Sequence, residues 1–179
     1  MQFIPTDIPG LIVVEPKVFA DARGFFMETW QEQVFRDHDL DVRFVQDNHS
    51  RSTRGVLRGL HYQAQRPQGK LVRVVVGEVF DVAVDLRADS PTFGRWHAEV
   101  LSADNRKMLW IPPGFAHGFY VLSEEAESLY KCTDFYQPQY ERCLKWDDPS
   151  VAIAWPLING EAPLLSSKDA KGLSLLEAT

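Results

Sequence analysis

Hydrophobic and polar residues alternate in several short stretches of the chain, most clearly at residues 80–86. Phe80-Asp81-Val82-Ala83-Val84-Asp85-Leu86 places apolar residues on one face and Asp81, Ala83 and Asp85 on the other. A period of two is typical of a β-strand, because successive side chains point to opposite faces. The carboxylates therefore face either water or a polar cavity, and the pattern leaves both possibilities open.

Further short strands are expected on both sides of this one. Turn-forming segments separate them, such as Ala88-Asp89-Ser90-Pro91 and Pro112-Pro113-Gly114, and Gly77 is expected to form another turn. The expected strands are Leu11–Val14, Gly24–Thr29, Val42–Asn48, Val56–Gln63, Leu71–Val76, Trp96–Leu101, Met108–Ile111, Phe115–Leu122 and Ser128–Phe135. Many short strands with this spacing predict an antiparallel sandwich or barrel.

Helical periodicity is scarce. A short helix is expected over Gln31–His38, and a helical turn over Ser166–Gly172. Ser166 or Ser167 would cap that turn, with Asp169 in its first turn.

The composition excludes several functional classes. The formal net charge is -6 and no basic run occurs, so nucleic acid is not an expected partner. No apolar stretch approaches the ~20 residues of a membrane helix, and the first residues lack a signal-peptide pattern. Cys132 and Cys143 fit neither a zinc motif nor a disulfide framework, so free thiols in a reducing cytosol are expected. We expect one cytoplasmic domain over residues 1–179, because no repeat or linker divides the chain.

The densest group of chemically active residues lies around His61. If the six residues 64–69 close a β-hairpin, Gln63 faces Lys70, and His61 lies on the same face as Gln63. His61 and Lys70 would then be diagonal neighbours, about 7–8 Å apart at Cα. A histidine beside a cation suits proton transfer. Taken alone, His61 would be equally typical of an ordinary strand histidine, and Lys70 would be a surface lysine of the hairpin.

In a regular strand, alternation would place Arg58 on the face opposite to that of His61 and Gln63. A glycine inside a strand often marks a bulge that redirects its neighbours, so Gly59 offers a way for Arg58 to reach the same site. Taken alone, Arg58 would be a surface arginine.

Metal binding is a second interpretation, because His61 and His117 could be two ligands in one barrel. Metal-binding barrels of this kind usually carry a His-x-His pair, whereas His61 is followed by Tyr62 and Gln63. Two histidines without a third ligand make a poor transition-metal site, so no metal is expected. Without other information, His117 would be a satisfied core histidine and Tyr130 a core or rim tyrosine.

Nine segments match, in order, the motifs of a known family. They are Arg23–Phe26, Gln46–Ser50, Gly55–Gln63, Gln68–Arg73, Gly77–Arg87, Ser90–Gly94, Ile111–Phe119, Leu129–Lys131 and Trp146–Pro149. On these segments, most specifically the motif around His61, the chain resembles the RmlC family of dTDP-4-dehydrorhamnose 3,5-epimerases. The resemblance implies an all-β, cupin-like double-stranded β-helix, or jelly-roll barrel, with a few short helices. It also implies a homodimer that uses neither metal nor cofactor.

Family members convert dTDP-4-dehydro-6-deoxy-D-glucose to dTDP-4-dehydro-L-rhamnose in dTDP-L-rhamnose biosynthesis, by moving protons at C3 and C5 beside the C4 ketone. By the same resemblance His61 is the general base and Asp169 its partner. Lys70 holds the enolate oxygen, and Tyr130 is the opposing acid.

The resemblance further implies which residues contact the substrate. They are Arg23, Glu28, Gln46, Asn48, Arg58, Lys70, His117, Glu141 and Lys168. Arg23 and Glu28 would reach the partner subunit's site through an exchanged N-terminal segment. Tyr140-Glu141-Arg142-Cys143 is less typical of the family, which makes Glu141 the least secure of these assignments.

Three alternatives stay open. The first is a related enzyme that acts on one carbon only, or a ketoisomerase of a similar dTDP-4-keto sugar. The second is a non-catalytic barrel that binds a sugar nucleotide. A metal-dependent cupin oxygenase is the least favoured.

Overall fold

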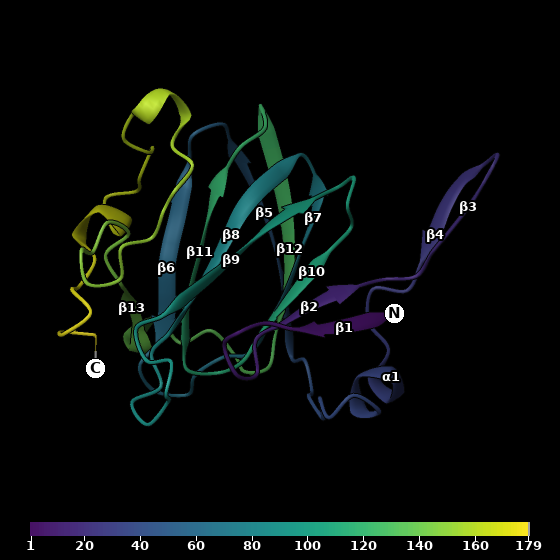
Figure 1. The fold of residues 1–179 in the computed structure, drawn as a ribbon, viewed down its shortest axis with the longest axis horizontal. Helices are drawn as coiled ribbons and strands as arrows, with labels where there is room; N and C mark the ends of the chain where they lie inside the picture. Colours follow the sequence, from purple (N-terminus) through teal and green to yellow (C-terminus); the bar gives the residue numbers. More distant parts are fainter. Residues whose placement is uncertain (179) are drawn as a thin grey trace.

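A computed structural model describes residues 1–178 and shows a barrel made from two antiparallel sheets (Figure 1). The barrel strands are β1 (Gln2–Pro5), β2 (Ile12–Glu15), β5 (Gln46–Thr53), β6 (Leu57–Gln63), β7 (Lys70–Val76), β8 (Glu78–Asp85), β9 (Trp96–Ser102), β10 (Met108–Ile111), β11 (Phe115–Val121), β12 (Glu125–Cys132) and β13 (Glu141–Cys143). One sheet has the order β1-β2-β10-β7-β12-β5 and the other β13-β6-β11-β8-β9. The predicted all-β jelly-roll fold is confirmed.

Strands that follow one another in the chain mostly lie in opposite sheets, and this overturns one prediction. β6 and β7 do not form a hairpin, because they belong to different sheets. Gln63 pairs with Glu141, whereas Lys70 pairs with Cys132. The end of the connecting segment is held beside the six-stranded sheet instead, since the backbone of Gly69 exchanges hydrogen bonds with Thr133, the residue after β12.

The structure also decides between the two possibilities for the carboxylates of β8. Asp81 and Asp85 are both fully buried and therefore do not face water. On the opposite face, Val82 and Val84 pack in a cluster with Leu175 of the C-terminal segment. β8 is thus buried on both faces, and its polar face points into the barrel.

Several strand boundaries differ from the predicted ones. β5 begins at Gln46 rather than Val42, and β12 covers Glu125–Cys132 rather than Ser128–Phe135. The short strands β1, β3 (Val18–Asp21) and β13 were not predicted. They have three or four residues each, too few to show a period of two.

The helical elements are short. The helix α1 (Glu32–Arg36) lies within the predicted range, and the side chain of Gln31 caps it by accepting from the backbone N–H of Val34. Three 3₁₀ turns follow, η1 (Pro138–Tyr140), η2 (Ile158–Gly160) and η3 (Asp169–Lys171). Among the described residues, no helix is both long enough and apolar enough to span a membrane.

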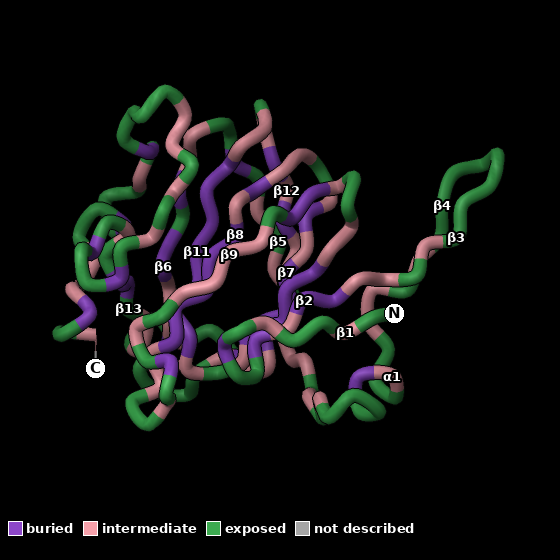
Figure 2. Tube along the Cα trace, viewed as in Figure 1, coloured by how far each residue is buried: buried purple, intermediate pink, exposed green. Residues whose placement is uncertain are grey.

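A hairpin of β3 (Val18–Asp21) and β4 (Gly24–Met27) projects away from the barrel (Figure 1). Nearly all of it is exposed (Figure 2), including the large rings of Phe19, Phe25 and Phe26. Exposed aromatic residues on a projecting arm are typical of an interaction surface.

Candidate active site

A cavity of about 350 Å³ lies between the two sheets. Strands of both sheets contribute its walls, so it sits inside the barrel. The residues that line it are Gln46, Asn48, Ser50, Arg58, His61, Tyr62, Gln63, Gln68, Lys70, His117, Gly118, Phe119, Tyr130, Cys132, Tyr136 and Glu141. Seven of the predicted substrate contacts, all but Arg23 and Glu28, lie in this set or in direct contact with it.

His61 and Asp169 form a hydrogen-bonded pair at this cavity. Nε2 of His61 lies 2.5 Å from Oδ1 of Asp169, which is only 4% exposed. Burial alone would raise the pKa of Asp169, but hydrogen bonds from His61 and Ser166 outweigh it and lower that pKa. A carboxylate that accepts from Nε2 leaves Nδ1 as the unprotonated nitrogen of a neutral imidazole, so the pair is suited to accept a proton.

The C-terminal segment brings Asp169 to His61. Backbone hydrogen bonds join Leu173 to Cys143 and to Lys145, which attaches this segment beside β13. Gly172 allows this close approach, because a Cβ there would lie 2.6 Å from Cα of Lys145. The chain therefore reaches the sheet edge at the point where β13 pairs with β6, the strand of His61.

Lys70 reaches the same cavity from the opposite sheet. Its Nζ donates to the backbone oxygen of His61 at 3.4 Å, and the residue is only 9% exposed. Burial lowers the pKa of Lys70, while the nearby groups of Cys132, Asp81 and Glu141 act to raise it. The predicted meeting of His61 and Lys70 is therefore found, but it occurs across the barrel interior rather than along a ladder.

Gly59 introduces the predicted bulge into β6. The register with β11 shifts there, since His61 pairs with His117 and Arg58 with Phe119. Gly59 has φ +117°, and a Cβ on it would lie 2.6 Å from Cα of Gly118. Arg58 consequently lines the cavity, as predicted from the glycine.

A second histidine–carboxylate pair lies deeper in the barrel. Nε2 of His117 is 2.9 Å and 3.1 Å from the two carboxylate oxygens of Asp81. Burial lowers the pKa of His117, although Asp81 acts in the opposite direction. The sequence did not single out Asp81 as a site residue. The sequence does place Asp81 on the polar face of residues 80–86, but this pattern alone does not show whether that face lines a cavity or contacts solvent.

The rim of the cavity carries a linked group of polar residues. Glu141 accepts a hydrogen bond from the hydroxyl of Tyr136 at 2.5 Å and forms an ion pair with Lys168. That hydrogen bond, with a smaller contribution from burial, raises the pKa of Tyr136 to about 12. Tyr136 was missed at the sequence level, because a lone tyrosine in a loop carries no distinguishing pattern. Tyr130 lies nearby, and burial raises its pKa, so its hydroxyl keeps its proton near neutral pH.

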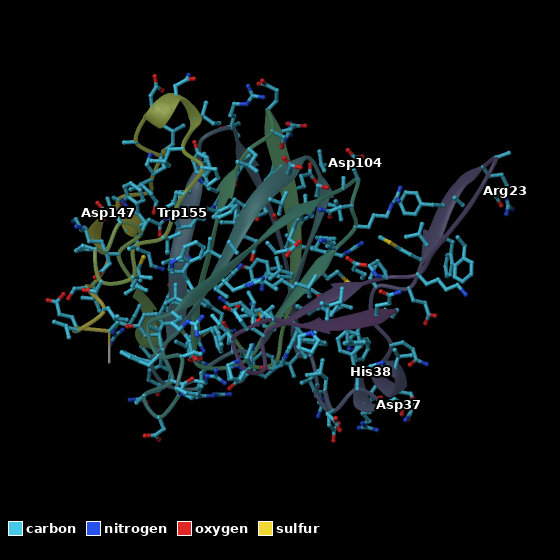
Figure 3. All side chains as sticks on the ribbon, viewed as in Figure 1. Arg23, Asp37, His38, Asp104, Asp147 and Trp155 are labelled. Carbon is cyan, nitrogen blue, oxygen red and sulfur yellow. The ribbon has the colours of Figure 1, made fainter. Side chains whose placement is uncertain are left out.

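Two predicted substrate contacts lie away from this cavity. Arg23 is at the tip of the projecting hairpin (Figure 3), where its side chain is 90% exposed and pairs with Asp21. Glu28 is exposed just beyond β4. Neither lines the cavity of its own chain.

Within residues 1–178, one group of side chains has the composition of a metal site. The ligand atoms of His61, Cys143 and Asp169 lie within 4.8 Å of one another. The donors fit a metal poorly, because the imidazole and the carboxylate already bind each other. Metal binding by cysteine requires the thiolate, and burial and Asp169 raise the pKa of the Cys143 thiol to about 12.

A jelly-roll barrel that encloses a histidine–aspartate pair, a buried lysine and a tyrosine defines a cupin-like enzyme of the acid–base type. A family model described as dTDP-4-dehydrorhamnose 3,5-epimerase matches residues 5–177. The chain therefore belongs to the dTDP-4-dehydrorhamnose 3,5-epimerase family, whose members are isomerases.

Individual relatives agree with this assignment. An epimerase of that name from Pseudomonas aeruginosa is 60% identical, over 96% of this chain and 94% of its own length. One from Neisseria gonorrhoeae is 57% identical over 99% of this chain, which spans only 54% of that relative's length. The crystal structure of RmlC from Legionella pneumophila in complex with dTDP-4-keto-L-rhamnose has a TM-score of 0.94 and 54% identity, and the match covers 98% of this chain and 93% of that one.

Proposed function

We propose that this protein converts dTDP-4-dehydro-6-deoxy-D-glucose to dTDP-4-dehydro-L-rhamnose, by epimerising C3 and C5 in dTDP-L-rhamnose biosynthesis. The observation that carries the proposal is the convergence of the His61–Asp169 pair, Lys70 and Tyr130 on one cavity. The names of the relatives support the same reaction, and the ligand of the Legionella structure is a dTDP-linked keto sugar.

The chemistry needs a base and a cation next to the ketone. His61 accepts the proton beside C4, and Asp169 fixes its tautomer and stabilises the imidazolium. The buried ammonium group of Lys70 stabilises the enolate oxygen that develops at C4. A preorganised donor of this kind contributes about 3–4 kcal/mol to the transition state, and positioned acid–base groups accelerate such steps about 10²–10⁴-fold.

Inversion requires that the proton return from the other face of the sugar. Tyr130 supplies it, because its raised pKa keeps the hydroxyl protonated. C3 and C5 both flank C4, so one base and one acid serve each carbon in turn. Every step is a proton transfer, so the reaction requires no redox cofactor.

The remaining cavity residues match the polar parts of a sugar nucleotide. Arg58 provides a cation for the diphosphate, and its Nε is held by the hydroxyl of Ser52 at 2.8 Å. Gln46 and Asn48 present linked amide groups on β5. His117, Glu141 and Lys168 complete the proposed substrate contacts.

We also propose a homodimer in which Arg23 and Glu28 act in the partner's cavity. The projection of the β3–β4 hairpin and its exposed aromatic rings support this arrangement. The test mixes two inactive variants, Arg23→Ala and His61→Ala, after unfolding and refolding them together. Action in the partner's site restores one intact site per mixed dimer, whereas action within the same chain restores none.

The two free thiols, Cys132 and Cys143, further support a reducing, cytosolic location.

Isotope exchange tests the proposed reaction. In D₂O, the enzyme should place deuterium at both C3 and C5 of the product. Label at a single carbon would identify a single-carbon epimerase. Tight binding of the nucleotide sugar without any exchange would identify a non-catalytic barrel, and unlabelled product would contradict the enolate mechanism.

A further inference from the structure

The two oxygens of the Asp169 carboxylate have different partners. Oδ1 accepts from Nε2 of His61, and Oδ2 accepts from the hydroxyl of Ser166 at 2.8 Å. The backbone N–H of Asp169 donates back to the same hydroxyl at 3.1 Å. Ser166 therefore contacts both the side chain and the main chain of Asp169, which fixes the direction in which Oδ1 points.

The hydrogen bonds that the Ser166 side chain makes to Asp169 are different from the bonds that attach the C-terminal segment to the barrel. The segment is attached by backbone hydrogen bonds of Leu164 to Gly55 and Leu57, and of Leu173 to Cys143 and Lys145. The Ser166 hydroxyl takes part in none of these bonds. Removing it should therefore leave the segment attached while releasing one carboxylate oxygen.

We propose that Ser166 is a positioning residue of the active site, the third member of a Ser166–Asp169–His61 hydrogen-bonded chain. This inference rests on the proposed role of His61 as the base. Ser166 aims the carboxylate at Nε2 and stabilises its negative charge, so that His61 keeps the tautomer whose Nδ1 accepts the proton. A hydrogen bond to a charged group such as this carboxylate is commonly worth about 10–100-fold in an equilibrium constant.

The charged surroundings determine how the chain responds to pH. Groups that face the dyad are Cys143 and Glu141 on β13, Lys168 before η3, His117 on β11 and Lys70 on β7. The substitution of Ser166 changes none of them. When the Ser166 hydroxyl no longer donates to Asp169, the negative charge of the His61–Asp169 pair is less stabilised. The pair as a whole therefore binds a proton more tightly. Since the base must be unprotonated, the acid limb of kcat/KM should move to higher pH.

The experiment compares Ser166→Ala with Ser166→Thr, which keeps a hydroxyl. Ser167→Ala is the matched control, because Ser167 is the adjacent serine and is exposed like Ser166, but its side chain makes no hydrogen bond within residues 1–178. For each variant, kcat, KM, the pH profile of kcat/KM and the melting temperature are measured with the dTDP-4-keto sugar. Ser166→Ala should lower kcat about 10-fold or more at pH 7 with little change in KM, and shift the acid limb upward. Ser166→Thr should restore both values toward wild type.

Three outcomes would overturn the proposal. The first is a Ser166→Ala enzyme with wild-type kcat and an unmoved acid limb. The second is a loss of activity that is accompanied by a lowered melting temperature, while the acid limb stays where it is. This result would indicate a purely structural role. The third is an equal effect of Ser167→Ala. Failure of the proposed function is detected separately, because the wild-type enzyme would then place no deuterium at C3 or C5. Failure of the proposed base would appear as full activity in His61→Ala.

Discussion

Nε2 of His61 lies 2.5 Å from Oδ1 of Asp169, although 108 positions separate the two residues in the chain. β6 carries the histidine, and the segment around η3 carries the carboxylate. The pair forms only when this segment attaches beside β13. The proposed proton transfer therefore depends on two parts of the chain that local sequence patterns do not connect.

Replacement of His61 should remove the reaction without unfolding the barrel. We expect His61→Ala to lower isotope exchange at C3 and C5 by about 10²–10⁴-fold, because the proposed base is removed. Deuterium incorporation followed by NMR measures this loss. His49→Ala is the control, since His49 is exposed on β5. Substantial exchange in His61→Ala would remove His61 from the mechanism.

Replacement of Lys70 should slow the chemical step more than substrate binding. We expect Lys70→Met to lower kcat about 10²–10³-fold, because the developing enolate loses its cation. Methionine keeps the length of the side chain without its charge. Lys131→Met is the control, since Lys131 lies on the same sheet and pairs with Asp47. A normal kcat in Lys70→Met would contradict the proposed role.

Removal of the Tyr130 hydroxyl should separate the two halves of the reaction. His61 can still take a proton and return it to the same face, so Tyr130→Phe should put deuterium into recovered substrate while forming little product. Product formation and substrate labelling are measured together by NMR and mass spectrometry. Equal loss of both signals would show that Tyr130 does not act as the opposing acid.

Asp85 should contribute to stability in a pH-dependent way. Burial alone would raise its pKa, but bonds from Arg87, Ser90 and Thr92 outweigh it and hold the pKa at about 2. A depressed pKa stabilises the fold above the unfolded value of about 3.9, and this contribution, about 2–3 kcal/mol, is lost as pH falls through 2.

Asp85→Asn should therefore lower the free energy of unfolding at pH 7, and its difference from wild type should shrink between pH 4 and pH 2. Urea unfolding across this range measures both quantities. Asp89→Asn, at an exposed turn, serves as the control. A difference that stays constant with pH would show that the loss comes from packing rather than from charge.

Chelation should leave turnover unchanged. The His61, Cys143 and Asp169 group already has its imidazole and carboxylate bound to each other. Dialysis against EDTA, with metal analysis of the protein before and after, checks the expectation. Activity that falls on dialysis and returns with added metal would overturn the metal-free mechanism.

The sequence predicts the fold well, because the period of two along segments such as residues 80–86 is a local property. It also predicts the Gly59 bulge, since a glycine in the interior of a strand commonly marks such an irregularity. The prediction of a hairpin between β6 and β7 was wrong for a physical reason. Local alternation identifies strands, but the choice between two sheets depends on which distant strand offers free hydrogen-bonding groups.

In the candidate site, too, features set by local sequence are predicted and those set by distant contacts are missed. Family motifs place His61, Lys70 and Tyr130 correctly in one cavity. Asp81 and Tyr136 were missed, because their roles come from burial beside His117 and from a bond to Glu141. Such contacts exist only in the folded chain, so no window of sequence contains them.

The attachment of the segment around Asp169 has a consequence for synthesis of the protein. The last barrel strand ends at Cys143, so every strand leaves the ribosome before the carboxylate does. A nascent chain that has not yet released the segment around η3 has His61 but lacks the carboxylate that is proposed to support the imidazolium. On the proposed mechanism, the base therefore lacks its partner until residues beyond the last barrel strand have been synthesised and attached.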